Sequence, residues 1–588
     1  MNAARSPAKA APTIWLTAGN VLLAGAALVG LVFLLDPWIH DSEQGLGLSL
    51  LNAAPLLLIW LPAGALFRRV WAPAIITAFV AWLLYDINGI KLEELAQPLL
   101  FTDILLTAQV VGNTDLLARY SQPLFLLTIA ATAVLLVAIA CRLEPARPGW
   151  GSSAVLSALT VILILVSATG PVSRTFAQHG SLATPWSPIE SVRKTGLLAS
   201  LAASAGKDLV ELPTPDEVHL DSIRTQLAGS LPTAIPMPQP KPDIVVILSE
   251  SFFEPGLLNG VETCNYLPQW CALKASGASG QMRIPTYGGN TTRTEFEVLT
   301  GIPYNVLPAG IYPFTSVVRR PMVALPQWLQ HLGYATTAVH PHKRTFWQRH
   351  RAYPLLGFER FVSEENMTGY TRKGWFISDA DMTDQIVDVL DQNGDKPQFL
   401  FAISMENHGP WNRPRPDLDQ ERLADIPFPE GLDETGQLAW RQYIYHAQNA
   451  IEEMQRLMDY LSARERPFVV LFFGDHLPGL ASVYETLGFR DGNHPSWQPT
   501  PYLLLANDGS VPSALPVDRS YQLPMQLLQA SKLPSPMLYR QLAATYSSDP
   551  DKQTEGTAEA LQIALLHADP QAWPREYSET AVQKLTTQ

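Results

Sequence analysis

The side chains most able to do chemistry in this sequence are acids and a histidine that directly follow short apolar runs. Glu250 follows the run at 243–249, and the pair Asp475 and His476 follows the run at 467–473. Carboxylate oxygens and an imidazole nitrogen are accepted ligands of divalent metals. Taken singly, Glu250 could be a helix cap or a surface acid, and Asp475 could be a capping residue beside a buried histidine. Their matching positions favour one shared metal site.

A threonine is the candidate nucleophile. Residues 287–296 read YGGNTTRTEF, so glycines precede Thr291 and a helical pattern follows it. The N–H groups and dipole of a helix N-terminus favour an anionic oxygen or a phosphate. A threonine hydroxyl needs activation by a metal or a base, and the alternative interpretation is an ordinary helix N-cap. Successive helical residues are turned about 100° apart, so we expect Thr291, and not Thr292 or Thr294, to face the metal.

Two further clusters offer groups for an anionic ligand that carries hydroxyls. An arginine guanidinium matches phosphate oxygens, and histidine and tryptophan side chains suit the rest of such a ligand. The alternatives are a basic surface loop for the first cluster and a Gly-Pro turn that happens to hold a histidine for the second. The residues are His340, Trp347 and Arg349 after the run at 334–340, and His408 after the run at 398–404.

The apolar runs alternate with helical patterns over the second half of the chain. Continuous apolar strands alternating with helices predict an α/β domain with a mostly parallel sheet covered by helices. In such sheets ligands gather at the carboxyl ends of the strands, so the separate candidates should converge at one edge. The strands are predicted at 243–249, 334–340, 398–404, 467–473 and 502–505, and helices at 321–332, 379–392 and 441–463.

The first third of the chain has the composition of membrane spans. The whole chain is 47% hydrophobic and 16% charged, whereas soluble proteins have about 25% charged residues. A bilayer-spanning helix needs roughly 20 apolar residues. Such stretches lie at 14–35, 47–66, 70–86, 122–141 and 153–172. The first has no clear cleavage site for a signal peptide, and the third, which is short and holds Pro73, is expected to be the weakest.

Loop charges predict the orientation of these spans, because basic residues accumulate on the cytoplasmic side. The basic residues are Arg5, Lys9, Arg68, Arg69, Arg142 and Arg147. Everything after about residue 173 is then outside the cytoplasm. The loop at 88–120 is either an interfacial amphipathic segment or a plain connector. The net charge of -13 argues against nucleic acid as a partner.

The predicted domains are a transmembrane region at 1–173, a linker at 174–240, a catalytic α/β domain at 241–545 and a polar tail at 546–588. The linker combines an amphipathic piece that could rest on the bilayer with a Pro-rich spacer. The three cysteines are too few for a disulfide scaffold. Cys264 and Cys271 are close enough to form a bridge in an oxidising compartment, and the alternative is two unpaired cysteines.

The motifs resemble the lipoteichoic acid synthase family of the alkaline phosphatase/sulfatase superfamily, which includes periplasmic glucan phosphoglycerol transferases. The resemblance covers the span–linker–domain layout, and the motifs agree in order and spacing. They are Leu248-Ser249-Glu250-Ser251-Phe252, Gly289-Asn290-Thr291 with Glu295-Phe296, His340 with Trp347 and Arg349, Asn407-His408, and Gly474-Asp475-His476. The family's location implies a bacterial cytoplasmic (inner) membrane protein whose catalytic domain faces the periplasm or the cell exterior.

This resemblance implies roles for the candidate residues. The metal ligands would be Glu250, Thr291, Asp475 and His476, Thr291 would also be the nucleophile, and the head group would be held by His340, Trp347, Arg349 and His408. The implied cofactor is one divalent metal, Mn²⁺ first, with Mg²⁺ or Zn²⁺ as alternatives. At His342 the family tends to carry an acidic residue, which is a departure. The formylglycine signature of true sulfatases is absent.

The implied function is a membrane-bound phosphoglycerol transfer from a phospholipid, phosphatidylglycerol, to an extracytoplasmic glycan or polymer through a covalent intermediate on threonine. The excess of arginine over lysine, with abundant Ala and Pro, is typical of a GC-rich genome and favours a periplasmic glucan as acceptor. The alternatives are a phosphoethanolamine transferase, a phosphodiester hydrolase and an inactive membrane-anchored sensor. The oligomeric state is not predicted.

Overall fold

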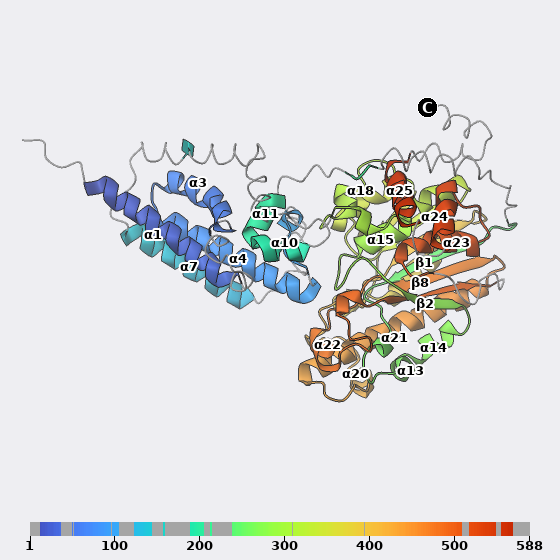
Figure 1. The fold of residues 1–588 in the computed structure, drawn as a ribbon. Helices are drawn as coiled ribbons and strands as arrows, with labels where there is room; N and C mark the ends of the chain where they lie inside the picture. Colours follow the sequence, from blue (N-terminus) through green and yellow to red (C-terminus); the bar gives the residue numbers. More distant parts are fainter. Residues whose placement is uncertain are drawn as a thin grey trace, which may run out of the picture. The chain divides into compact units, whose positions relative to one another are not determined.

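The computed structural model divides into two compact units, a helical unit at Met1–Leu209 and an α/β unit at Val210–Gln588. Each is described by itself (Figure 1). The described residues are 12–36, 50, 52–95, 97–104, 123–143, 157–158, 188–204, 212–214, 238–308, 310–392, 394–507, 517–547 and 554–568.

The helical unit contains the helices α1 (Pro12–Leu35), α3 (Leu57–Phe67), α4 (Trp71–Leu95) and α7 (Pro123–Leu143). Among the described residues, one helix, Trp71–Leu92, is long and apolar enough to cross a bilayer, and shorter apolar helices occur at Gly19–Leu35, Ala54–Phe67 and Leu127–Arg142. The stretch expected to be weakest is therefore the longest described helix of this unit. Pro73 lies in its first turn, where a backbone N–H is not needed.

Five spans remain a prediction. Apart from residues 157–158, the stretch at 153–172 lies outside the described residues, as does most of the Pro-rich linker. The loop expected at 88–120 begins later, because α4 continues to Leu95, and residues 105–120 of that loop lie outside the described part.

The amphipathic piece of the linker forms two short helices, α10 (Pro188–Thr195) and α11 (Leu197–Ser204). Val192, Leu197 and Leu198 are buried in the core of the helical unit. The apolar side of this piece thus packs on neighbouring helices.

A buried polar cluster joins α11 to the rest of the helical unit. Asn52 Nδ2 and Tyr85 OH donate hydrogen bonds to Asp36 Oδ2 at 2.8 and 3.0 Å. The backbone N–H of Leu197 donates to the same oxygen at 3.3 Å, and that of Ala199 donates to Asn52 Oδ1 at 3.0 Å. Segments distant in sequence are therefore held together by hydrogen bonds inside this unit.

The α/β unit is built on a seven-stranded sheet in the order β2-β9-β8-β1-β7-β3-β4. The strands β8, β1, β7, β3 and β4 run parallel, while β9 is antiparallel to β8 and β2 is antiparallel to β9. The predicted mostly parallel sheet is confirmed. The strands are β1 (Asp243–Ser249), β2 (Ala278–Met282), β3 (Ala335–His340), β4 (Arg360–Ser363), β7 (Gln398–Ile403), β8 (Phe468–Gly474) and β9 (Thr500–Ala506), and a separate hairpin has β5 (Arg372–Lys373) and β6 (Phe376–Ile377).

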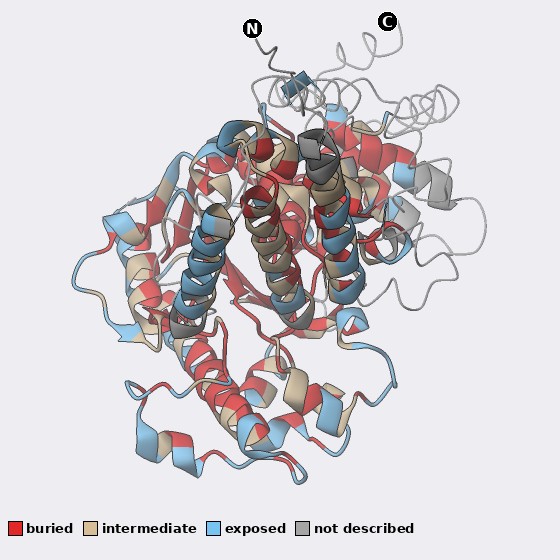
Figure 2. Ribbon diagram, turned by 90° about the vertical axis from the view of Figure 1, so that its left-hand side faces the viewer, coloured by how far each residue is buried: buried red, intermediate tan, exposed pale blue. Residues whose placement is uncertain are grey.

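Helices cover both faces of this sheet, and the central strands are buried throughout (Figures 1 and 2). One face carries α15 (Thr292–Thr300), α17 (Leu325–His331), α18 (Arg349–Leu356), α23 (Leu523–Ala530), α24 (Met537–Ser547) and α25 (Thr554–His567). The other carries α14 (Pro268–Lys274), α19 (Asp379–Gln392) and α21 (Glu434–Ser462). Shorter helices are α13 (Thr263–Tyr266), α16 (Pro313–Ser316), α20 (Gln420–Asp425) and α22 (Ala481–Leu487).

Two features correct or complete the expectations from the sequence. The region expected to be a polar tail contributes α25, whose Leu561, Leu565 and Leu566 are buried in the main core. The segment is polar on average, but three of its leucines lie on the side of the helix that faces the core. Cys264 and Cys271 form a disulfide between α13 and α14.

Candidate active site

The candidate residues meet at one edge of the sheet because their strands are neighbours. The strands β8, β1, β7 and β3 are adjacent and parallel. Their carboxyl ends lead to Asp475, Glu250, His408 and His340, respectively. This is the edge at which open α/β sheets bind ligands.

Three of the four predicted metal ligands form a compact buried group. Potential ligand atoms of Glu250, Asp475 and His476 all lie within 4.8 Å of one another. His476 Nε2 is 3.3 Å from Glu250 Oε1 and 3.2 Å from Asp475 Oδ2. All three side chains are buried.

The donor atoms of this group fit a divalent cation. His476 Nδ1 is 3.0 Å from the carbonyl oxygen of Leu477, which can only accept, so Nδ1 carries the proton and Nε2 presents a lone pair. That lone pair faces two carboxylates, and both Nε2 and Asp475 Oδ2 are buried without a hydrogen-bond partner. Burial, and then the Asp475 carboxylate, raise the pKa of Glu250 well above its usual value. A cation bound among these atoms would relieve the repulsion.

The backbone fixes these ligands in place. Asp475 Oδ1 accepts hydrogen bonds from the N–H groups of Ser251 at 2.8 Å and His476 at 3.0 Å. Glu250 Oε1 accepts from the Ser251 hydroxyl at 2.8 Å, and the Glu250 N–H donates to Ser404 Oγ at 3.0 Å. Both carboxylates are therefore oriented by contacts that leave other oxygens available to a metal.

The loop and first turn that flank Thr291 are hydrogen bonded to the segment that follows β8. The N–H of Gly288 donates to Leu477 O at 3.1 Å, and the Thr294 hydroxyl donates to Asp475 O at 2.9 Å. Gly288 and Asn290 have left-handed φ values of 67° and 63°, which make the tight bend. The predicted helix start is confirmed: Thr291 is the N-cap residue, and its side chain makes no capping hydrogen bond. Its hydroxyl is thus not used by the helix.

His340 offers an acceptor to the site. Its Nδ1 is 3.4 Å from Ile403 O, which places the proton on Nδ1, and Nε2 is buried with no hydrogen-bond partner. Burial, together with the positive charge of Arg349, lowers the pKa of His340 well below its usual value. The neutral ring therefore presents a lone pair suited to a hydroxyl group of a ligand.

Arg349 is held differently from the sequence expectation. Its Nε lies 3.2 Å from both Glu295 carboxylate oxygens, and its Nη2 forms an ion pair with Glu295 Oε1. Tyr353 OH donates to Glu295 Oε2 at 2.7 Å. The Arg349 nitrogens that were predicted to bind a phosphate with two hydrogen bonds therefore bind the Glu295 carboxylate. Nη1, which is buried without a partner, is the nitrogen left for a ligand.

Of the remaining predicted pocket residues, Trp347 lies in the short 3-10 helix η4 (Phe346–Gln348) and His408 in the loop after β7. Trp347 has a left-handed φ of 56°, and its ring centroid lies 4.7 Å from that of Tyr312. His408 Nδ1 donates to Gly409 O at 3.0 Å, and its ring lies 5.0 Å from Phe376. These contacts give both rings defined orientations.

The structure adds residues that the sequence did not single out. Arg415 Nη2 donates to the carbonyl oxygens of His408 at 2.9 Å and Pro410 at 3.1 Å. Its Nη1 lies 2.6 Å from His446 Nε2, and His446 Nδ1 lies 2.9 Å from Glu406 Oε1. This chain of contacts holds the loop that carries His408. His446 is 31 residues from Arg415 and 40 from Glu406, so no local pattern marked it as part of this set.

His342, where the family tends to carry an acidic residue, makes an aromatic contact in this structure. Its ring stacks on Phe346 with centroids 4.8 Å apart, and its Nδ1 accepts the N–H of Lys343 at 2.6 Å. Glu364 Oε2 lies 4.0 Å from the same Nδ1. An acid therefore lies beside this position but comes from another segment.

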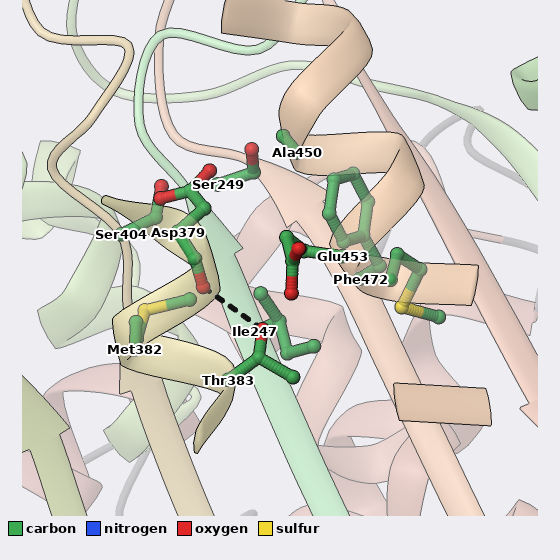
Figure 3. A pocket seen from close by; sticks show the side chains of 10 residues that line it. Ile247, Ser249, Asp379, Met382, Thr383, Ser404, Ala450, Glu453 and Phe472 are labelled. Atoms are coloured by element: carbon green, nitrogen blue, oxygen red, sulfur yellow. Dashed lines mark hydrogen bonds between the residues drawn. The ribbon is translucent and has the colours of Figure 1, made fainter. Parts of the chain in front are cut away.

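A small cavity lies behind the end of β1, between α19 and α21 (Figure 3). Its volume is about 10 Å³, and Ser249, Asp379 and Ser404 are among its lining residues. That is the space of a single water molecule. It is too small for a phospholipid head group, so it belongs to the support of the site and not to substrate binding.

Residues 242–533 match the Sulfatase family. These residues form a sulfatase domain of the alkaline phosphatase superfamily. A Rhizobium meliloti protein named for cyclic beta-1,2-glucan modification is 31% identical over 308 residues, which are 52% of this chain and 46% of that protein. The capsular polysaccharide biosynthesis protein RkpI of the same organism is 30% identical over 245 residues, 41% of this chain and 42% of that protein.

The chain thus spans less than half the length of these curated relatives. Among solved structures, the phosphoglycerol transferase GacH of Streptococcus pyogenes, in complex with sn-glycerol-1-phosphate, aligns with 20% identity and a TM-score of 0.48. The alignment covers 60% of this chain and 94% of that structure.

Proposed function

We propose that this chain is a membrane-bound phosphoglycerol transferase that moves glycerol phosphate from phosphatidylglycerol to an extracytoplasmic glycan or polymer. The observation that carries the proposal is the position of Thr291. Its helix is hydrogen bonded through Thr294 to Asp475, one of three buried residues whose lone pairs converge as metal ligands do. A nucleophile beside such a group is the arrangement of metal-assisted phosphoryl transfer.

Glu250, Asp475, His476 and the Thr291 oxygen would hold the cation. Mn²⁺ is the first candidate and Mg²⁺ or Zn²⁺ are alternatives. When bound, it would lower the pKa of the Thr291 hydroxyl. The first turn of α15 presents backbone N–H groups to the phosphate that approaches Thr291.

In the first step, Thr291 Oγ, having lost its proton to solvent, forms a bond to phosphorus, and the bond from phosphorus to the diacylglycerol oxygen breaks. His408 gives that oxygen a proton. In the second step, an acceptor hydroxyl attacks the same phosphorus, passes its proton to His408, and displaces Thr291 Oγ. His340, which is neutral, serves as a hydrogen-bond acceptor for a head-group hydroxyl and not as the acid.

The location and the acceptor belong to the same proposal. The disulfide Cys264–Cys271 is typical of oxidising compartments, and the helix Trp71–Leu92 is able to anchor the chain in a membrane. The names of the two curated relatives, one for glucan modification and one for capsular polysaccharide biosynthesis, favour a glycan as acceptor.

The test is the mass of the full-length protein after incubation with phosphatidylglycerol vesicles and Mn²⁺ but no acceptor. We expect a gain of one glycerol phosphoryl group that peptide mapping locates on Thr291. A phosphoethanolamine adduct from a mixed-lipid vesicle would instead identify the other transferase, and continuous release of free glycerol phosphate would identify a hydrolase.

Two variants decide the nucleophile. Thr291→Ala should form no adduct, whereas Thr292→Ala should still form it, because Thr292 is 0% exposed and Thr291 retains 8% exposure. An adduct on another residue, or head-group transfer by Thr291→Ala, would refute the mechanism.

A further inference from the structure

Arg293, two residues after Thr291, is a buried cation without an anionic partner. Its side chain is 2% exposed, and its Nε and Nη2 are buried with no hydrogen-bond partner. The other two buried arginines of the described residues each donate side-chain hydrogen bonds to acceptors on other residues. Arg349 pairs with Glu295, and Arg415 contacts His446 and two carbonyl oxygens. Nothing in the proposed mechanism uses Arg293.

Its surroundings are aromatic. The guanidinium carbon lies 4.6 Å from the ring centroid of Tyr304 and 5.8 Å from that of Tyr312. The Tyr304 hydroxyl donates to Ile311 O at 2.9 Å, so it is committed elsewhere. Cation–π contacts stabilise a desolvated guanidinium. They do not supply the acceptors that its N–H groups require, and burial of an unpaired charge costs more than such contacts return.

The place of Arg293 connects it to the candidate site. It belongs to the first turn of α15, whose N–H groups favour an anion. Tyr312, which lies against the guanidinium, also packs on Trp347 with ring centroids 4.7 Å apart. Trp347 is a predicted wall of the head-group pocket, so the aromatic contact of Arg293 extends to that pocket.

We propose that Arg293 binds an oxyanion of the substrate, a phosphate or a carboxylate, at a subsite formed with Tyr304 and Tyr312 next to the predicted head-group pocket. An oxyanion would provide the hydrogen-bond acceptors that Nε and Nη2 lack, in the planar geometry that a guanidinium matches. The subsite is separate from the metal ligands, because Arg293 contacts none of them among the described residues.

The first experiment measures thermal unfolding of the full-length protein in detergent, with EDTA present and inorganic phosphate as the probe. Chloride at equal ionic strength is the reference. A ligand that binds the folded state raises the unfolding midpoint. The parent should show a phosphate-dependent rise, and Arg293→Gln should show none. The matched control is Arg319→Gln, which removes the same charge from an exposed position and should respond like the parent.

Stability without phosphate separates binding from a structural role. Since Arg293 is an unpaired buried charge, Arg293→Gln should unfold at or above the parent's temperature when phosphate is absent. A parent that does not respond to phosphate, an Arg293→Gln protein that still responds, or one that unfolds well below the parent would each overturn the proposal. Arg293→Lys keeps the charge but loses the planar fork, and should need an about ten-fold higher phosphate concentration for the same rise.

Transfer kinetics then identify the source of the oxyanion. If Arg293→Gln has an increased KM for phosphatidylglycerol, the oxyanion that Arg293 binds belongs to the lipid donor. If it has an increased KM for the acceptor, the oxyanion belongs to the acceptor. Unchanged values for both would overturn the assignment to substrate. Phosphate binding in EDTA requires neither metal nor Thr291 chemistry, so this proposal and the proposed function fail in distinguishable ways.

Discussion

Asp475 divides its two carboxylate oxygens between the backbone and the candidate metal centre. Oδ1 accepts two backbone N–H groups, whereas Oδ2 faces His476 Nε2. We predict that Asp475→Asn lowers the metal content of the purified protein at least about ten-fold, since loss of even supporting groups reduces affinity by 10–100-fold. Elemental mass spectrometry would measure this, with Asp388→Asn, an exposed change on α19, as the control. Unchanged occupancy in a folded Asp475→Asn protein would contradict the assignment.

The Arg349–Glu295 pair predicts a change in both stability and binding. Arg349→Lys keeps the positive charge but cannot reproduce the bonds from Nε and Nη2 to one carboxylate. We expect a loss of about 1–3 kcal/mol in the free energy of unfolding and weaker binding of glycerol phosphate. Denaturant unfolding and calorimetry would measure the two effects. Arg351→Lys, exposed on the same helix, should change neither. Full binding by a destabilised Arg349→Lys would show that Nη1 does not touch the ligand.

At the scale of elements, the end of β8 depends on a glycine. A Cβ added to Gly474 would lie 1.9 Å from the backbone oxygen of Phe252. Gly474→Ala must therefore push apart the two strand ends that carry Asp475 and Glu250. We predict that metal binding is lost and that the unfolding midpoint falls. Gly89→Ala, where an added Cβ meets nothing within 4 Å, is the matched control. Normal metal affinity in Gly474→Ala would mean that these strand ends tolerate separation.

Helix α15 contains an acid whose ionisation opposes folding. Glu297 is buried, accepts the Tyr304 N–H at 2.7 Å, and also pairs with the Ser520 hydroxyl. Burial raises its pKa to about 7 from an ordinary value of 4.5. A raised carboxyl pKa means that the folded state binds the proton more tightly, so stability should fall as pH rises from 4.5 to about 7.

Glu297→Gln should lack this part of the pH dependence. Relative to that variant, the parent should lose about 3 kcal/mol of unfolding free energy across this window. Denaturant unfolding at several pH values would show it. Parallel pH profiles for the two proteins would contradict the assigned pKa.

The central strands could be predicted from the sequence and the edge strands could not, for a physical reason. β1, β7 and β8 are buried on both faces, so each is a continuous apolar run. β2 and β4 lie at the two edges of the sheet, are short and partly exposed, and carry polar residues.

The same distinction holds for the site. Glu250 and Asp475 directly follow predicted strands. Because the carboxyl ends of parallel strands meet at one edge of a sheet, their proximity could be predicted. The pairing of Arg349 with Glu295 joins positions 54 residues apart, and the missing partner of Arg293 depends on every segment around it. No local pattern encodes either fact.

For the whole molecule, the loop charges predict that the chain changes sides of the membrane before the sulfatase domain. A reporter that is active only outside the cytoplasm should be active when fused after Asp243 and inactive when fused after Arg69, which is in a predicted cytoplasmic loop. Reporter activity, normalised to the amount of membrane-inserted fusion, is the measurement. The reverse pattern, or activity of both fusions, would exclude the predicted orientation.

The buried polar cluster of the helical unit has a consequence for how the chain is completed during synthesis. Asp36 accepts a hydrogen bond from the N–H of Leu197, which is added 161 residues later. At about 5–20 residues per second, roughly 10–30 s separate the two. The hydrogen bond from the Ala199 N–H to Asn52 Oδ1 likewise forms only after Ala199 has been synthesised. The Asp36 carboxylate, which lies just after α1, therefore lacks its hydrogen bond from Leu197 until the linker emerges, so a ribosome that stalls before Leu197 leaves this unit unfinished.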